Sequence, residues 1–303
     1  MAVISTGAHP KLLWPGIKAV FGNTYKEFPE EYRQLFEIDS SDKAYEEDVG
    51  TSPFGLAPVK DQGAAIQYDS DTQGYTKRYT HVAYGLGYIV THEEIKDNLY
   101  FAAGKTRAQK LARAMRQTLE TIAANVYNRA HTSGYTGGDG VVLGSASHAT
   151  IAGNQSNTLA TAADLSEASL EDMCVQIMGA TDERGNKIAL MPRSLIVPRQ
   201  EWYNATRILK SALQNDSANN AVNALKATNA FPDGIIMNHF LSDGDAVFVR
   251  TDAPRGMICY EREPVTFDTD NDFDTKNARA AAYMRYSFGW TDWRGVYTNG
   301  GGA

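Results

Sequence analysis

The chain has 303 residues, of which 43% are hydrophobic, and its formal net charge is −7. This length and this hydrophobic content predict one large domain or two modest ones with a real core. The acidic balance argues against a surface that binds nucleic acid over its whole extent. Two cysteines in separate regions, Cys174 and Cys259, exclude a disulfide framework and suit a reducing interior. The sequence shows no signal peptide and no apolar stretch long enough to span a membrane.

Residues 1–45 are predicted to form an arm rather than a domain. Three prolines interrupt this segment, and a short apolar cluster from Leu12 to Phe21 precedes a charged stretch. One short helix is expected from Pro29 to Phe36, because proline is favoured in the first turn of a helix. A segment with so few apolar residues cannot form its own core, so the arm is expected to be disordered or docked on another surface.

Residues 46–90 are predicted to form a long β-hairpin with a polar, glycine-rich tip. Turn signals lie at residues 52–53, 61–63 and 69–74, and the last two bound one short strand, Ala64–Tyr68. A longer strand is expected over Tyr75–Val90, where apolar residues partly alternate. Because isolated hairpins are only marginally stable in water, a protruding one is expected to need a partner.

The centre of the chain, residues 92–131, is predicted to be one long helix with a single glycine, Gly104, where it could bend or break. Thr91 and Glu94 form a capping-box pattern at its start. Unbroken, the helix would be roughly 60 Å long, so it must lie along a surface that a sheet or a neighbouring molecule backs. Its middle is basic, through Lys105, Arg107, Lys110, Arg113 and Arg116. These residues form either a solvated face or a surface for an acidic partner, such as another subunit or nucleic acid.

The segment after this helix is predicted to be mostly loop, with one short strand at Val141–Leu143. A helix over Leu165–Gly179 follows, with Asp164 or Ser166 as its cap. A buried strand over Ala189–Val197, a second helix after Pro198 and a polar loop over residues 211–230 come next. The last third is predicted to return to strands over residues 234–237, 246–250, 256–260, 265–273, 278–289 and 293–297.

No catalytic or cofactor-binding pattern is complete in this sequence. Alternating aspartates over Asp268–Asp274 resemble the start of a calcium loop, but Phe273 occupies the glycine position and Arg279 the last ligand position. These aspartates are therefore expected to form a solvated turn. Cys174 and His148 could form a thiol nucleophile and its base, yet the sequence offers no group to orient them. Cys174 is expected to be a small core residue and His148 a hydrogen-bonding loop residue.

The order of these parts resembles that of a tailed-bacteriophage major capsid protein with the Hong Kong 97-like fold, and more closely the Mu-type major head subunit. THEEIKDN leads into the long helix, and DGVVLGSASHATIAGNQSNTL is similar to a loop of that family. Residues 165–209 resemble its succession of helix, turn, strand ending in proline, and helix. FGWTDWRGVY resembles its C-terminal strand. The resemblance covers nearly the whole chain, and its specificity lies in the order and spacing of the parts.

The resemblance implies an α+β fold with an N-arm (residues 1–45), an extended β-hairpin E-loop (46–90), a P-domain (91–163 and 262–303) with a spine helix (92–131), and an A-domain (164–261). It implies a structural, non-enzymatic protein that assembles in the host cytoplasm into pentamers and hexamers of an icosahedral virion shell around phage DNA. Nine residues of the arm, E-loop and spine helix are then expected at subunit interfaces: Trp14, Phe21, Phe54, Lys60, Tyr75, Lys77, Arg107, Lys110 and Arg113.

The implied partners are other copies of the chain, a separate scaffolding protein, a portal and packaged double-stranded DNA, with a decoration protein as a further candidate. No cofactor, metal or membrane is implied. The founding member of the fold forms a Lys–Asn cross-link, and Lys60 and Lys77 lie on the predicted E-loop. Neither an asparagine partner nor an acidic catalyst can be identified, so this chemistry is not carried over to this chain.

Three alternatives remain at this point. The first is the shell protein of an encapsulin-like bacterial nanocompartment, which shares the fold but encloses a cargo enzyme. The second is a soluble cysteine hydrolase that uses Cys174. The third is another virion component, such as a decoration or tail protein, although a long helix is unusual in those mostly β proteins.

Overall fold

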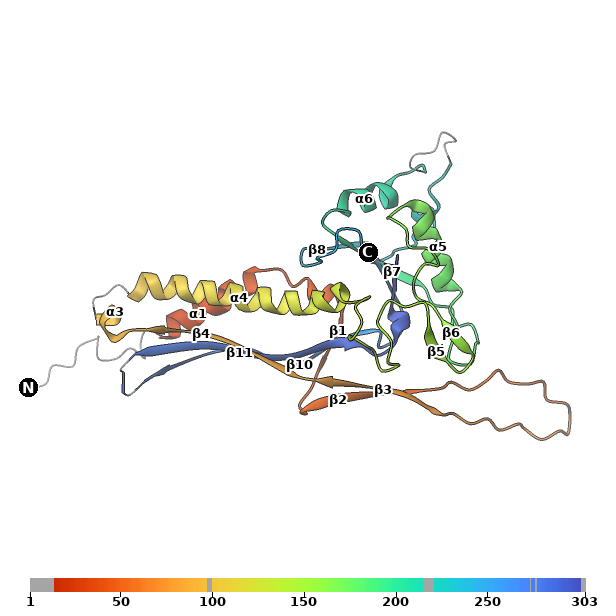
Figure 1. Ribbon diagram of the computed structural model, residues 1–303, viewed down its shortest axis with the longest axis horizontal. Helices are drawn as coiled ribbons and strands as arrows, with labels where there is room; N and C mark the ends of the chain where they lie inside the picture. Colours follow the sequence, from red (N-terminus) through yellow and green to blue (C-terminus); the bar gives the residue numbers. More distant parts are fainter. Residues whose placement is uncertain (1–13, 97–99, 215–220, 273, 276, 301–303) are drawn as a thin grey trace, which may run out of the picture.

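The computed structural model describes residues 14–96, 100–214, 221–272, 274–275 and 277–300. Two four-stranded sheets organise the elongated molecule, and two hairpins stand apart from them (Figure 1). The long sheet has the order β1-β10-β11-β4, with strands Glu37–Ser40, Met257–Asn271, Ala278–Trp290 and Val82–Val90. The small sheet has the order β12-β9-β7-β8, with strands Val296–Thr298, Phe248–Thr251, Pro192–Pro198 and Ile235–Asn238. The hairpins are β2–β3 (Tyr45–Thr51 and Gln73–Thr80) and β5–β6 (His148–Thr150 and Gly153–Gln155).

The predicted helix over residues 92–131 corresponds to two described helices, and residues 97–99 between them lie outside the described part of the structure. The two helices are α3 (His92–Lys96) and α4 (Tyr100–Asn128). Gly104 lies inside α4 and does not interrupt it. At the start of α3, Thr91 Oγ1 accepts a hydrogen bond from the Glu94 amide at 3.4 Å, as the capping pattern predicts. The 29 residues of α4 span roughly 43 Å, and the long sheet backs them as the length requires.

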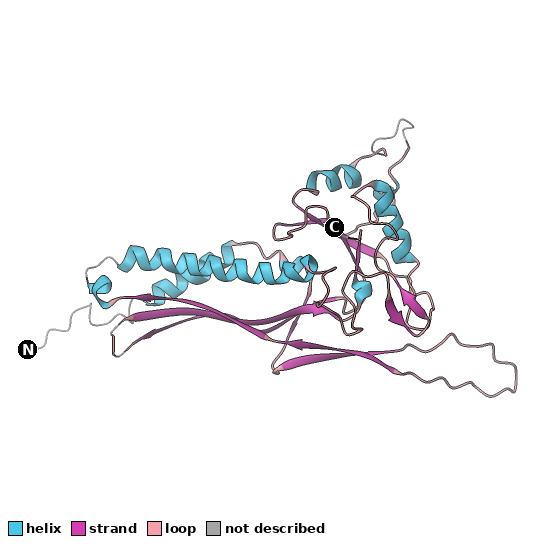
Figure 2. Ribbon diagram, viewed as in Figure 1, coloured by secondary structure: helices cyan, strands magenta, loops and turns pink. Residues whose placement is uncertain are grey.

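The apolar seam between α4 and the long sheet explains why this helix is so long. Alternate residues of β11 are buried from Ala278 to Tyr286, and the first three of them are alanines, so the helix backbone can lie close to the sheet there. Figure 2 shows α1 and α4 together on one side of the long strands. The buried positions are Ala278, Ala280, Ala282 and Met284 on β11, and Leu111, Met115, Leu119, Ala123 and Tyr127 on α4.

The N-terminal segment departs most from its prediction. Residues Trp14–Glu27 form helix α1, and the shorter α2 (Tyr32–Leu35) lies inside the helix expected near Pro29. The Phe21 side chain is 4% exposed, and its ring stacks on Phe267 of β10 at 4.8 Å. The described part of the predicted arm is therefore docked on its own chain, and Phe21, expected at a subunit interface, is buried within that chain. Strand β1, also within the predicted arm, pairs with β10 in parallel.

The predicted hairpin over residues 46–90 is too long. Strand β4 does not belong to it, because β4 pairs antiparallel with β11 in the long sheet, from Val82 opposite Tyr286 to Val90 opposite Ala278. The hairpin consists of β2 and β3, and residues 52–72 between them, all of which the structure describes, form an extended loop without a strand. The strand expected over residues 64–68 is therefore absent.

One residue, His81, joins β3 to β4. Its ring is buried, with Nε2 at 3.1 Å from Ser41 Oγ and Nδ1 at 3.1 Å from Ser287 Oγ. Burial lowers the pKa of His81, which keeps the ring neutral between the two hydroxyl groups. The direction in which the hairpin leaves the long sheet is thus held by contacts to a loop before β2 and to β11.

The small sheet carries helices α5 (Glu167–Met178), α6 (Trp202–Lys210) and α7 (Ala224–Ala227). Ser166 caps α5, because its Oγ accepts a hydrogen bond from the Ser169 amide at 3.1 Å. One face of β7 packs Leu195 and Val197 against α5 and α6, and the opposite face contributes Ile196 to the core under α4. The strand expected at Val141–Leu143 is a single bridge between residues 136 and 142, and the hairpin β5–β6 was not predicted.

Replacing Phe21 with alanine tests whether α1 is part of the fold. Truncating a buried phenylalanine costs about 3–5 kcal/mol, so we expect urea denaturation of the unassembled subunit to show a loss of about 3 kcal/mol or more. Lys18→Ala, at an exposed position of the same helix, is the control and should change the free energy of unfolding by less than about 0.5 kcal/mol. An equally small effect of Phe21→Ala would mean that α1 does not pack on the sheet in solution.

Candidate assembly surfaces

The extended loop, residues 52–72, exposes a row of large apolar side chains to solvent. It projects beyond the rest of the molecule (Figure 1). Scattered exposed apolar residues are normal on protein surfaces, but a concentration in one projecting segment marks an interaction site. The side chains and their exposed fractions are Phe54 (63%), Leu56 (82%), Val59 (95%), Ile66 (65%) and Tyr68 (95%). Phe54 was expected from the sequence and the other four were not, and Lys60 of the same loop is also exposed.

The two sides of the extended loop are joined near its base. Asp69 accepts hydrogen bonds from the Gly55 amide at 2.7 Å and from the Ser70 amide at 2.8 Å. Arg184, in the turn before β7, adds a bond from Nη1 to the Asp69 carboxylate at 2.7 Å. These contacts lower the pKa of Asp69, and the hydrogen bond from the Gly55 amide contributes most to this shift. The loop is thus tied to its own chain at the base, and its apolar tip has no such contacts.

The base of the hairpin is anchored on the end of β11. Asp48 of β2 accepts hydrogen bonds from Thr291 Oγ1 at 2.6 Å and from Arg255 Nη2 at 2.5 Å. Tyr79 of β3 packs on the sheet beside them, where a Cβ on Gly289 would lie 2.9 Å from the Tyr79 ring. Glycine at position 289 is therefore required for this close approach.

Tyr75 and Lys77, expected at subunit interfaces, contact their own chain. Tyr75 Oη donates a hydrogen bond to the Thr291 carbonyl at 3.0 Å. Lys77 Nζ donates to the Thr136 carbonyl at 2.8 Å and lies 5.0 Å from the centre of the Trp290 ring. Burial lowers the pKa of the Lys77 ammonium group. Both residues help to hold the hairpin on the sheet.

The basic stretch of α4 does not form one continuous positive surface. Arg107 pairs with Glu94 of α3 at 2.8 Å. Arg116 is buried, and its Nη2 donates to Glu30 at 2.9 Å. The remaining exposed members are Lys105, Lys110 and Arg113. Trp14, the first residue of α1, has a side chain outside the described part of the structure.

Glu120 of α4 is buried where α2 meets α4. Its Oε2 accepts a hydrogen bond from the Tyr32 amide at 2.9 Å, and among the described residues no donor reaches its Oε1. Desolvation raises the pKa of Glu120 from 4.5 to about 7. The contact of the N-terminal helices with α4 therefore includes a carboxyl group that titrates near neutral pH.

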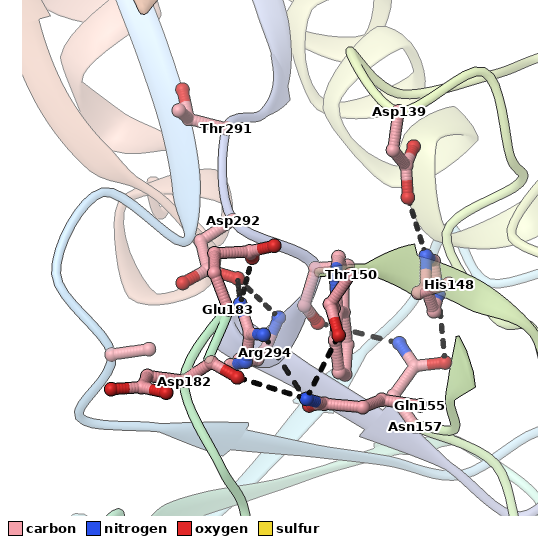
Figure 3. Close-up of polar contacts among 12 residues, drawn as sticks. Asp139, His148, Thr150, Gln155, Asn157, Asp182, Glu183, Thr291, Asp292 and Arg294 are labelled. Atoms are coloured by element: carbon pink, nitrogen blue, oxygen red, sulfur yellow. Dashed lines mark hydrogen bonds and ion pairs between the residues drawn. The ribbon is translucent and has the colours of Figure 1, made fainter. Parts of the chain in front are cut away.

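A buried polar junction links the small sheet to the loops around β5 and β6 (Figure 3). Arg294 is 4% exposed, and it donates from Nε to the Thr181 carbonyl at 2.9 Å and from Nη1 to Glu183 at 3.1 Å. Asn157 is fully buried, and its Nδ2 donates to the Val296 carbonyl at 2.9 Å. The side chains in this junction are occupied by each other and by the backbone, as in a structural network.

The same junction occupies His148, the base of the conceivable thiol nucleophile. Its Nδ1 lies 2.6 Å from Asp139 and its Nε2 3.3 Å from Asn157 Oδ1, and its ring stacks on Trp293. Cys174 belongs to the core beneath α5, where burial raises the pKa of its thiol to about 11. The two side chains do not form a catalytic pair, since both ring nitrogens of His148 have other partners.

Comparison with known proteins identifies the family of this chain. A family model described as phage capsid protein matches residues 74–299. The chain belongs to the phage capsid protein family. It is a major capsid protein, a structural component of the virion and not an enzyme, so the cysteine-hydrolase alternative is wrong. A search of curated proteins finds no match.

Solved structures show that this capsid protein has the Hong Kong 97-like fold. One match is a virus-like particle from Pyrococcus furiosus, with 10% identity and a TM-score of 0.51 over 94% of this chain and 97% of that chain. Microbacterium phage Oxtober96 matches with 10% identity and a TM-score of 0.52 over 89% and 92% of the two chains. The capsid of a native GTA particle matches with 12% identity and a TM-score of 0.52 over 89% and 90%. At these identities the likeness concerns the fold alone.

The described residues were also compared with what membrane spans and metal sites require, and they match neither. Within the described ranges, the capsid protein has no helix that is both long and apolar enough to cross a membrane. The described residues also include no group of three or more His, Cys, Asp or Glu side chains that could hold a metal ion. In the acidic turn after β10, Asp272 instead accepts a hydrogen bond from Thr275 Oγ1 at 2.9 Å and pairs with Arg279.

Replacing Glu120 with glutamine should change how stability depends on pH. An unfolded glutamate ionises near 4.5 and the folded one near 7, so unfolding releases a proton between these values. Stability contributed by this group is therefore lost as pH rises from about 4.5 to 7, and Glu120→Gln should gain more, relative to the native chain, at pH 8 than at pH 5.

The measurement is the thermal midpoint of the unassembled subunit at both pH values. Glu27→Gln, at an exposed position of α1, makes the same chemical change and should shift both midpoints equally. An equal shift for Glu120→Gln at pH 5 and pH 8 would show that Glu120 is ionised in the folded subunit across this range.

Proposed function

We propose that this capsid protein forms pentamers and hexamers that close into an icosahedral shell around double-stranded DNA. The observation that carries the proposal is the extended loop, whose apolar side chains contact nothing comparable in their own chain. Covering such side chains by a neighbouring copy removes apolar surface from water at many equivalent sites in one shell. The family match to phage capsid proteins supports the same assembly.

We assign the parts of the subunit by comparison with the fold. Hairpin β2–β3 with the extended loop is the E-loop, helix α4 is the spine helix, and the long sheet forms the P-domain. The small sheet with α5, α6 and α7 forms the A-domain, near the capsomer centre. Two boundaries differ from the sequence-based division, because β4 belongs to the P-domain and β12 pairs with β9 of the small sheet.

In the proposed shell the E-loop lies over the spine helix and P-domain of a neighbouring subunit. Phe54 and Lys60 are then contact residues of the loop, and the exposed Lys110 and Arg113 are candidate contacts on the neighbour's spine helix. The segment before Trp14, which the resemblance expects to clasp another subunit, lies outside the described residues. Each interface contributes a modest binding free energy, and these contributions add together when the shell closes.

Further partners follow from the resemblance to the Mu-type head subunit, carried by residues 139–159 and 165–209. We propose a separate scaffolding protein and a portal as partners, and a decoration protein as a further candidate. The net charge of −7 suits a shell that contains DNA without adhering to it strongly. The alternative of a bacterial compartment shell shares the fold, but the matching family model describes phage capsid proteins. Portal and terminase genes beside this gene, rather than a cargo gene, would support the phage assignment.

Electron microscopy in negative stain, with light scattering, tests the assembly directly. The full chain, purified alone and with the products of its neighbouring genes, is expected to give closed shells or capsomer rings. Shell diameter then gives the lattice size. A monodisperse monomer in every preparation would overturn the proposal.

Introducing a charge at the tip of the extended loop should weaken assembly. Burial of a large apolar side chain is worth about 1.5–3 kcal/mol, so Val59→Asp is expected to reduce subunit affinity roughly tenfold or more. The fraction of protein in rings or shells, measured by sedimentation, should fall while the circular dichroism melting curve stays unchanged.

Gln67→Asp is the matched control, because it adds the same charge to the same loop without removing an apolar side chain. Assembly of Val59→Asp at the level of this control would show that the apolar tip is not buried in the shell.

A further inference from the structure

A groove opens on the outer side of the A-domain between α5 and residues 224–232. Its volume is about 610 Å³. Three large apolar side chains in its wall are unusually exposed: Val175 (64%), Met178 (46%) and Met191 (51%). Acidic residues also line it, Glu171 from α5 and Asp252 from the loop after β9. The groove is thus apolar in its wall and acidic at its edges.

The acidic character of the groove is not cancelled by its arginine. Arg193 lines the groove but is paired with Asp233 at 3.0 Å. The carboxylates of Glu171 and Asp252 are thus the groove's remaining charges. An apolar segment with flanking positive charges would fit this surface better than a neutral one.

Helix α6 presents a surface of that kind. Tyr203, Arg207 and Lys210 are all exposed, and Tyr203 is 74% exposed. Their spacing of four and three residues places them in one stripe along the helix. The stripe lies on the side of α6 opposite Ala205 and Ile208, which pack in the core. An exposed tyrosine flanked by an arginine is typical of residues that dominate binding at interfaces.

The groove and the stripe lie on different parts of the A-domain, so one copy cannot use its own stripe to fill its own groove. The core residues Leu170 and Ile177 of α5 and Ile208 of α6 pack toward the small sheet, and no residue of α6 lines the groove. Two different patches that are complementary to each other produce a heterologous contact between copies, and repetition of this contact about an axis closes a ring.

We propose that the α6 stripe of one subunit docks in the α5 groove of the next subunit around the capsomer, an inference that rests on the proposed function. Tyr203 enters between Val175 and Met178. Arg207 and Lys210 lie against the acidic edge formed by Glu171 and Asp252. The occupant of the groove is therefore a second copy of this chain.

Paired cysteines test the contact in assembled particles. The variant with Met178→Cys and Tyr203→Cys is oxidised mildly after assembly and run on a non-reducing gel. We expect a ladder of cross-linked species that ends at five or six subunits and collapses to monomer on reduction. The native Cys174 and Cys259 are buried, and each single-cysteine variant controls for their reactivity.

Two results of this experiment would overturn the inference. Shells without a ladder would show that the proposed function holds but that the stripe and groove do not meet. A ladder from Met178→Cys with Phe54→Cys, but not with Tyr203→Cys, would place the extended loop of a neighbour in the groove. Failure of the native chain to assemble in any preparation would instead overturn the proposed function, and the inference with it.

Charge reversal gives an independent measurement. Arg207→Glu and Glu171→Arg should each reduce the yield of assembled particles at least about tenfold through like-charge contacts across the interface. The double variant should recover most of the native yield, which a purely structural role for either residue would not produce. Lys18→Glu, on the remote helix α1, is the control. Additive losses in the double variant would contradict the contact.

Discussion

The subunit depends on the apolar seam between α4 and the long sheet. Among the described elements, the paired strands β10 and β11, with 15 and 13 residues, are long enough to back a helix of 29 residues along most of its length. Alanines on the inner face of β11 let the helix approach, and α1 fills the space beside it with Phe21. The result is a rigid bar to which the hairpin is attached along one side and the A-domain at one end. The surfaces that are proposed to contact neighbouring subunits can then project from this bar while the packing of the bar stays intact.

The attachments of these parts are polar, whereas the bar itself is apolar. Asp48 holds the hairpin through Thr291 and Arg255, and Arg294 and Asn157 hold the loops around the small sheet. Buried hydrogen bonds fix orientation more strictly than apolar contacts do, because their geometry is directional. Orientation is what a capsid subunit must control, since small angular errors would accumulate around a closed shell.

The central elements could be predicted from the sequence because their signals are local. The helix formers after Thr91, the cap Ser166 and the strand ending at Pro198 each act over a few residues. Helix α1 was missed because Pro10, Pro15 and Pro29 suggested an arm, although Pro15 lies in the first turn of α1, where proline is tolerated. The alternation of residues 82–90 correctly indicated a strand, but its partner β11 lies almost two hundred positions away along the chain, and no local pattern identifies that pairing.

Several residues expected at interfaces have contacts that the sequence could not reveal, for a related reason. Basic and aromatic residues on the hairpin and α4 were sensible candidates, but Tyr75, Lys77 and Arg107 have partners within the chain that only the fold brings near. Exposed apolar residues such as Val59 and Tyr203 could be identified only from the structure, because the sequence does not show which side chains lack neighbours. His148 and Asn157, within a segment that carried the family resemblance, lie in the junction beside the small sheet. The resemblance there reflects structural requirements and not chemistry.

The single residue between β3 and β4 has a mechanical consequence. Because His81 is the whole connection and its ring is clasped by two serine hydroxyls, the hairpin cannot swing on a flexible tether. A sideways pull on the extended loop becomes a torque on β11 and on the segment before β2. The hairpin therefore moves together with the long sheet, and a displacement at its tip is transmitted directly to the rigid bar of the subunit. A shell built from such subunits would deform as one connected structure, with a local load distributed among many copies.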